Sequence, residues 1–203
     1  MHTSIYLASQ SPRRAELLRQ IGVSFQCVEQ NTPELHQKHE TSQEFVLRLA
    51  KDKALDGLKN IQIQKLPAAP VLASDTIVVV DDMILGKPEN QQHALKMLTA
   101  LSNRVHRVMT AVAMVDANLI LKTVISTSEV EFAAISPKQA LAYWQTGEPQ
   151  DKAGSYAIQG LGAIFVKSLN GSYSGVMGLP IFETTQLLKE FSIDILSEKL
   201  SNE

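Results

Sequence analysis

The chain has 203 residues, of which 44% are hydrophobic and 20% are charged. This composition is typical of an ordinary globular protein with enough apolar residues for one substantial core, and it excludes an intrinsically disordered chain. A formal net charge of -2 and an aromatic content of 5% argue against a nucleic-acid-binding module, which usually carries basic and stacking aromatic side chains.

Cysteine usage and the N-terminus indicate where the protein works. The single cysteine, Cys27, excludes an internal disulfide, and the alternation of Val23, Phe25 and Cys27 predicts a buried strand residue. The first residues lack the charged start and apolar run of a signal peptide, and the apolar runs are too short to span a bilayer. We therefore expect a cytoplasmic protein that does not insert into a membrane.

The first elements predicted are a buried strand at 5–8 and a helix after it. Ser11 is suited to the N-cap, Pro12 to the first helical turn, and Gly22 to the end of the helix. A second helix begins at Thr41, which has capping-box spacing to Glu44.

The stretch 71–80 is the strongest strand signal, and its nearly continuous β-branched residues predict burial of both faces. A turn, a short return strand at 83–85 and a helix opened by Pro88-Glu89 follow. The remaining predicted elements are strands at 104–115, 119–133 and 163–169, a helix opened by Ser136-Pro137, and a last helix at 180–191. Mixed helices and strands with at least one hairpin predict an α/β fold with a mixed twisted sheet flanked by helices.

The segment from Ser9 to Arg14 is the first candidate for chemistry. Hydroxyls, two guanidinium groups and the backbone N–H groups of a helix start together suit an anion such as phosphate. A well-capped surface helix with solvated arginines is the alternative.

Asp75 is the second candidate, because a charge inside an otherwise apolar strand is costly unless it is paired. Its alternative is a turn aspartate that closes a shorter strand. Lys87, between a glycine and a proline, and Lys53, on the second helix, could bind an anion or lie in solvent. The small-residue segment 151–162 could approach a planar base closely or be an ordinary glycine-rich connection.

These segments together resemble the Maf family, the septum-formation-inhibitor-like nucleotide pyrophosphatases, from Leu7 to about Glu190. The matching segments, whose order and spacing carry the resemblance, are LASQSPRR at 7–14, RLAKDKA at 48–54, SDT at 74–76, GKP at 86–88, DKAGSY at 151–156, QG at 159–160 and VMGLP at 176–180. The resemblance implies a single domain over 1–203 with two lobes around a central cleft. It also implies an elongated shape and a fold similar to that of inosine-triphosphate pyrophosphatases.

The resemblance further implies hydrolysis between the α and β phosphates of a nucleoside triphosphate, assisted by Mg²⁺ or Mn²⁺. It places the proton acceptor and a metal ligand on Asp75, a second metal ligand on Glu34, and substrate binding on Ser9, Arg14, Lys53 and Lys87. The loop before Glu34 is less acidic than in many members, so a metal role for this loop rests on Glu34 alone.

Substrate choice follows from three further positions. Arg13, Thr76 and Gln159 match the branch that acts on dTTP and UTP, so we expect hydrolysis of these nucleotides and house-cleaning of modified pyrimidine nucleotides. The alternatives are the same reaction on 7-methyl-GTP, and a nucleotide-binding regulator of cell division with little turnover. The expected partner is a small nucleotide, with neither nucleic acid nor membrane, and a homodimer is consistent with the resemblance.

Overall fold

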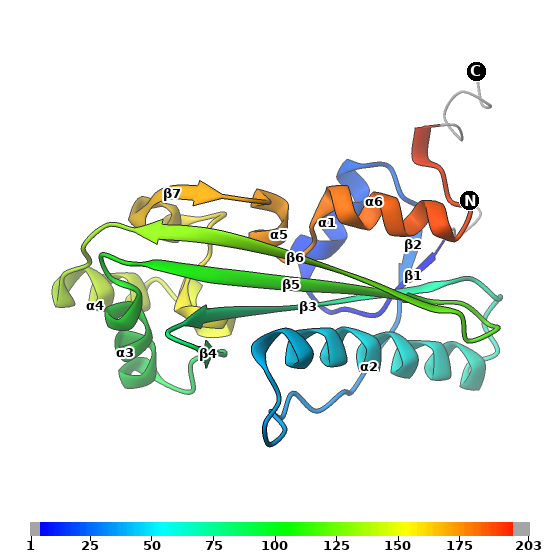
Figure 1. Cartoon of the computed structure of the whole chain (residues 1–203), viewed down its shortest axis with the longest axis horizontal. Coiled ribbons are helices and arrows are strands. Elements are labelled where there is room, and N and C mark those ends of the chain that lie inside the picture. Colours follow the sequence, from blue (N-terminus) through cyan, green and yellow to red (C-terminus); the bar gives the residue numbers. More distant parts are fainter. Residues whose placement is uncertain (1–4, 197–203) are drawn as a thin grey trace. The chain divides into compact units, whose positions relative to one another are not determined.

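The computed structural model describes residues 5–196, and the chain within this range divides into two compact units (Figure 1). The first unit comprises residues 5–75, 110–126 and 178–196, and the second comprises 76–109 and 127–177. Across residues 5–196, no helix combines the length and the apolar character needed to cross a membrane.

The strands of the described residues form one mixed sheet in the order β2-β1-β3-β5-β6-β7, and β4 pairs with β3. Their bounds are β1 Ile5–Leu7, β2 Phe25–Cys27, β3 Val71–Val80, β4 Met83–Leu85, β5 Val105–Val115, β6 Leu121–Phe132 and β7 Val166–Asn170. The β1–β2 and β1–β3 pairs are parallel, whereas the β3–β4 and β6–β7 pairs are antiparallel. The predicted α/β fold with a mixed sheet is therefore confirmed.

Helices flank this sheet, as the sequence predicts. Their bounds are α1 Pro12–Gln20, α2 Ser42–Ile63, α3 Gln91–Leu101, α4 Pro137–Gln145, α5 Tyr173–Met177 and α6 Ile181–Glu190, with short 3-10 helices at Glu148–Asp151, Ala153–Ser155 and Leu161–Phe165. The predicted capping box at Thr41 forms with Glu44, and Ser136, predicted as the start of its helix, forms a second capping box with Gln139.

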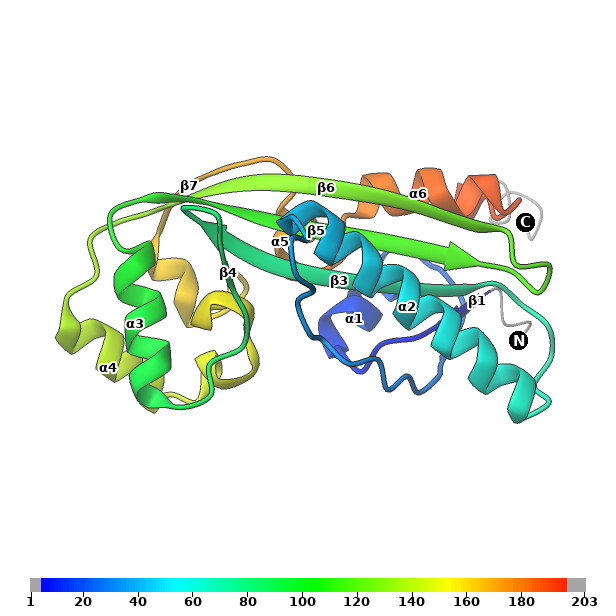
Figure 2. The same ribbon diagram turned by 60° about the horizontal axis from the view of Figure 1, so that its bottom comes forward.

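In the first unit, α1 connects β1 to β2 and α2 connects β2 back to β3. Since β1 lies between β2 and β3, two right-handed crossovers run in opposite directions and put α1 and α2 on opposite faces. Helix α2 lies along the strands in both views (Figures 1 and 2), with α6 on the other side of them. The absence of a side chain at Gly57 permits this close approach, because a Cβ there would lie 2.6 Å from the Cβ of Ala8.

Strand β3 carries the middle of the sheet, and its observed bounds equal the predicted ones. Every residue of β3 is buried except Thr76, which is half-buried. The predicted burial of both faces is thus confirmed, and it leaves Asp75 as a carboxylate within an apolar strand.

The core of the second unit is rich in aromatic rings. Phe132 lies edge-on to Tyr156 at 4.7 Å and to His106 at 4.8 Å, measured between ring centroids. Tyr143 packs against Phe165 at 5.3 Å. These edge-to-face contacts are those that aromatic quadrupoles favour.

Several predicted details are wrong. Helix α3 begins at Gln91 rather than at Pro88, because the side chain of Asn90 accepts the N–H of His93 and forms the cap. The loop before the last helix contains α5. Cys27 is exposed rather than buried, because β2 is the edge strand of the described sheet.

Candidate functional site

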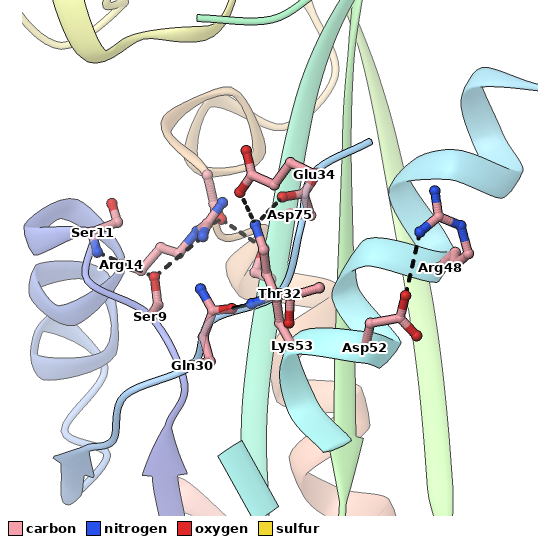
Figure 3. Close-up of polar contacts among 12 residues, drawn as sticks. Ser9, Ser11, Arg14, Gln30, Thr32, Glu34, Arg48, Asp52, Lys53 and Asp75 are labelled. Carbon is pink, nitrogen blue, oxygen red and sulfur yellow. Dashed lines mark hydrogen bonds and ion pairs between the residues drawn. The ribbon is translucent and has the colours of Figure 1, made fainter. Parts of the chain in front are cut away.

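Asp75 lies in the middle of β3 with 5% of its surface exposed. Its Oδ1 accepts a hydrogen bond from Nζ of Lys53 at 2.5 Å (Figure 3). Lys53 projects from α2 and is itself 4% exposed. A buried charge needs a partner of opposite sign, and each of these residues supplies one to the other.

Glu34 completes a triad with these two residues. Its Oε1 accepts a hydrogen bond from Nζ of Lys53, also at 2.5 Å, so one ammonium group lies between two carboxylates. Glu34 comes from the irregular segment between β2 and α2. Both carboxylates therefore point an oxygen at the same positive centre, although they are far apart in the sequence.

The segment that carries Glu34 is fastened to α2. The N–H of Asn31 donates to Asp56 at 2.7 Å, and the side chain of Asn60 donates to the carbonyl of Glu29 at 2.8 Å. Arg48 donates to the carbonyl of Leu35 at 2.9 Å. Three residues of one helix thus hold this segment on both sides of Glu34.

Arg48 is itself fixed by Glu40 in a bidentate ion pair, with N···O distances of 2.6 and 2.9 Å. The hydrogen bonds from Arg48 lower the pKa of Glu40 from 4.5 to about 2. We did not predict this pair from the sequence. Helical spacing could not indicate it, because Glu40 precedes α2 and Arg48 lies within it.

Arg14 extends the site from α1. Its Nε donates to the carbonyl of Gly178 at 2.9 Å and its NH1 donates to Oγ of Ser9 at 3.2 Å. Burial lowers the pKa of Arg14, whereas the negative charges of Asp75 and Glu34 oppose that shift. The Arg14 guanidinium therefore interacts electrostatically with the carboxylates of Asp75 and Glu34 and belongs to the same site.

Ser11 occupies the N-cap position of α1, as predicted, but in the described structure its side chain makes no capping hydrogen bond. The N–H of Ser11 instead donates to Oγ of Ser9 at 3.2 Å. The start of α1 thus combines Ser9, Arg14 and helix N–H groups, which are the donors that an anion requires.

The carbonyl of Gly178 links three elements of the first unit. It accepts hydrogen bonds from Arg14 and from Oγ of Ser74, the latter at 2.9 Å, just before α6 begins. Gly178 has a φ of 114°, a backbone conformation that residues other than glycine rarely adopt. Sequence reasoning missed Ser74 and this carbonyl, because a backbone acceptor leaves no side-chain signal.

Most of the other predicted site residues belong to the second unit. Arg13 is half-buried on α1, and Thr76 follows Asp75 on β3 as the first residue of the second unit. Lys87 and Gln159 are exposed residues of the second unit. The structure brings together the predicted residues of the first unit, namely Ser9, Arg14, Glu34, Lys53 and Asp75.

The charged side chains of this site suit both an anionic ligand and a metal cation. Two cationic side chains can hold phosphate oxygens, and two carboxylates can hold a hard cation or accept a proton. Among residues 5–196, no cluster of three or more His, Cys, Asp and Glu side chains could hold a metal ion without other ligands.

Comparison with known proteins gives a consistent relationship. A family model described as Maf-like protein matches residues 4–191. A dTTP/UTP pyrophosphatase from Alkalilimnicola ehrlichii is 50% identical over 191 residues, covering 94% of both chains. One from Aliivibrio fischeri is 50% identical over 192 residues, covering 94% of this chain and 100% of the relative. A solved HAM1 protein from Coxiella burnetii is 19% identical, with a TM-score of 0.47, covering 92% of this chain and 98% of the other.

Proposed function

This chain belongs to the Maf family, and from that premise we propose that it is a pyrophosphatase that hydrolyses dTTP and UTP to the monophosphates and pyrophosphate. Curated relatives that share about half of its residues carry that name. The observation that supports the reaction is the Lys53 ammonium between Glu34 and Asp75, with Arg14 in the same electrostatic site.

Substrate binding rests on positive charge. A triphosphate is highly anionic, and catalysis of its cleavage depends on positioning and on cations placed where charge develops. Arg14 and Lys53 bind the phosphates, with Ser9 and the N–H groups at the start of α1 as further donors. The proposal also includes Lys87 as a further phosphate-binding cation.

Glu34 and Asp75 fit a divalent metal ion, because their oxygens already converge on one cationic group. Oxygen ligands suit Mg²⁺ and Mn²⁺, which often take one or two carboxylates and complete their coordination with phosphate oxygens and water. Glu34 and Asp75 would hold such an ion, which would supply positive charge against the phosphates and lower the pKa of the attacking water.

Asp75 acts as the proton acceptor. A water molecule attacks the α-phosphorus, its proton passes to the Asp75 carboxylate, and the bond from the α-phosphorus to the bridging oxygen breaks to release pyrophosphate. A free aspartate has a pKa of about 3.9 and is a weak base, so orienting the water matters as much as accepting its proton.

Base selection falls to Arg13, Thr76 and Gln159. Hydrogen bonds from such side chains to a pyrimidine edge can reject a wrong base strongly, because polar groups covered by the bound base would otherwise lose their partners. The same contacts admit modified pyrimidine nucleotides, for which house-cleaning hydrolysis is proposed. The proposal includes a cytoplasmic location, and a homodimer stays a prediction.

A panel of triphosphates tests this function. Pyrophosphate release is measured for dTTP, UTP, CTP, GTP and 7-methyl-GTP with Mg²⁺, with Mn²⁺ and with a chelator. We expect dTTP and UTP to be hydrolysed best, and only with a metal ion. Faster hydrolysis of 7-methyl-GTP than of dTTP and UTP would show that the substrate carries a different base. Tight nucleotide binding without hydrolysis would favour a nucleotide-binding regulator over an enzyme.

A further inference from the structure

The side chain of Glu148 accepts hydrogen bonds from three groups of the second unit. Oε1 accepts the hydroxyl of Tyr143 at 2.6 Å and the N–H of Gly162 at 2.9 Å. Oε2 accepts the N–H of Leu161 at 2.9 Å. An ionised carboxylate only accepts hydrogen bonds, so all three donors are satisfied by one group.

Two glycines allow the backbone to lie directly on this carboxylate. A Cβ on Gly160 would lie 2.3 Å from Oε2 of Glu148, and the φ of Gly160 is 151°. A Cβ on Gly162 would lie 2.5 Å from the Tyr143 hydroxyl and 2.6 Å from the carbonyl oxygen of Ala157. A side chain at Gly160 would need an unfavourable positive φ and would displace the Glu148 carboxylate, and one at Gly162 would collide with the backbone of Ala157.

Tyr143 holds the other end of the same segment. Its hydroxyl accepts the N–H of Ala157 at 3.1 Å, and its ring is 4% exposed in the core of the unit. Hydrogen bonds at Ala157 and at Leu161 therefore fix the backbone on both sides of Gln159. The side chain of Gln159 is exposed, so the backbone determines where its amide can reach.

We propose that Glu148, together with Tyr143, is a positioning residue for base selection, which fixes the Ala157–Gly162 backbone and thereby places Gln159. This inference rests on the proposed function, in which Gln159 contacts the base. Hydrogen-bonded support of this kind matters because a small misplacement of a contacting group weakens discrimination far more than it weakens folding.

Glu148→Gln tests the proposal with little change of shape. The amide keeps one acceptor oxygen but turns an NH₂ group toward a backbone N–H that needs an acceptor. We expect the ratio of kcat/KM for UTP to that for CTP to fall about 10-fold, since misplacing a binding group can cost up to about 100-fold. The rise in KM for UTP should exceed the fall in kcat, because Glu148 supports the proposed base contact and does not contact the proton acceptor Asp75.

Glu131→Gln is the matched control. Glu131 is also a glutamate of the second unit that accepts hydrogen bonds from two side chains, those of Lys167 and Ser168, and neither partner belongs to the Ala157–Gly162 segment. The same substitution there should leave the UTP-to-CTP ratio unchanged. Tyr143→Phe, which keeps the buried ring and removes only the hydroxyl, should lower the ratio in the same direction and serves if Glu148→Gln does not fold.

A double-mutant cycle with Gln159→Ala separates positioning from general damage. If Glu148 acts through Gln159, Glu148→Gln should lower the ratio no further in the Gln159→Ala background. An unchanged ratio in folded Glu148→Gln, or full additivity with Gln159→Ala, would overturn the proposal. Wild-type protein that hydrolyses no triphosphate would instead overturn the proposed function itself.

Discussion

The ammonium of Lys53 lies 2.5 Å from a carboxylate oxygen of Asp75 and equally close to one of Glu34, but the two ion pairs differ in exposure. The side chains of Lys53 and Asp75 are 5% and 8% exposed, whereas that of Glu34 is 46% exposed. Solvent therefore weakens the electrostatic attraction between Lys53 and Glu34, whereas the Lys53–Asp75 pair is largely excluded from solvent. Glu34 can therefore leave Lys53 at small cost, while Asp75 cannot.

The first prediction concerns the stability of this asymmetric triad. Lys53→Met should lower the free energy of unfolding by about 3 kcal/mol, because it removes the cation that hydrogen-bonds the buried Asp75 carboxylate. Glu34→Gln should cost at most about 1 kcal/mol, as expected for a pair that is partly solvated. Urea unfolding followed by circular dichroism gives both values, with Lys59→Met, on the exposed face of α2, as the control. Equal losses for Lys53→Met and Glu34→Gln would contradict the assignment of Asp75 as the dominant partner.

The second prediction concerns Asp75 in turnover. Asp75→Asn should keep the fold, because an amide oxygen can still accept the hydrogen bond from Lys53. It should lower kcat for dTTP and UTP by about 10²–10⁴-fold, the usual contribution of a general base. Steady-state kinetics at saturating Mg²⁺ provide the measurement. Asp82→Asn, at an exposed aspartate that pairs with Arg107, is the control and should retain activity. Near-normal turnover in folded Asp75→Asn would remove this residue from the mechanism.

Elements of the fold that depend on neighbouring residues could be predicted from the sequence, whereas those that depend on residues far apart in the chain could not. Strand β3, the capping box at Thr41 and the helix start at Ser136 were predicted correctly, because each depends on neighbours within a few residues. The burial of Cys27 was predicted wrongly, because alternation along a strand does not reveal that the strand lies at an edge.

The site shows the same division. The resemblance supplied Ser9, Arg14, Glu34, Lys53 and Asp75, which the structure places together. The contacts that support these residues, namely the Gly178 carbonyl and the Arg48–Glu40 pair, were not predicted, and neither was the three-donor contact of Glu148 in the second unit. These depend on backbone groups or on long-range geometry, which side-chain patterns do not encode. The roles of the site residues stay predictions for the kinetic experiments.

The third prediction concerns the Arg48–Glu40 pair in acid. The pKa of Glu40 falls from 4.5 to about 2 in the folded protein, so the native state binds a proton less readily than the unfolded state does. The stabilisation is therefore complete above pH 4.5 and disappears as the pH falls toward 2. The difference in unfolding free energy between wild type and Glu40→Gln should shrink over this range. Glu16→Gln, at an exposed position of α1, is the control, and a difference that stays constant from pH 5 to pH 2 would contradict the prediction.

The fourth prediction concerns His106, which is 2% exposed in the aromatic core of the second unit. Its Nε2 lies 2.8 Å from the hydroxyl of Tyr156, and no group within residues 5–196 hydrogen-bonds its buried Nδ1. Burial lowers the pKa of His106 from 6.5 to about 4, so the folded protein keeps the ring neutral where the unfolded chain would protonate it. Stability should accordingly fall as the pH drops from 6.5 to 4.

The expected loss over that interval is about 3 kcal/mol, from roughly 1.4 kcal/mol per pKa unit. The double variant His106→Phe, Tyr156→Phe removes the titrating ring together with the hydroxyl that would otherwise lack its partner. Unfolding free energies at half-unit pH steps should show a flatter profile for this variant than for wild type. His39→Asn is the control, because His39 is exposed and its φ of 64° is one that asparagine tolerates. If the variant and the wild type lose stability in parallel between pH 6.5 and 4, the acid sensitivity arises from groups other than His106.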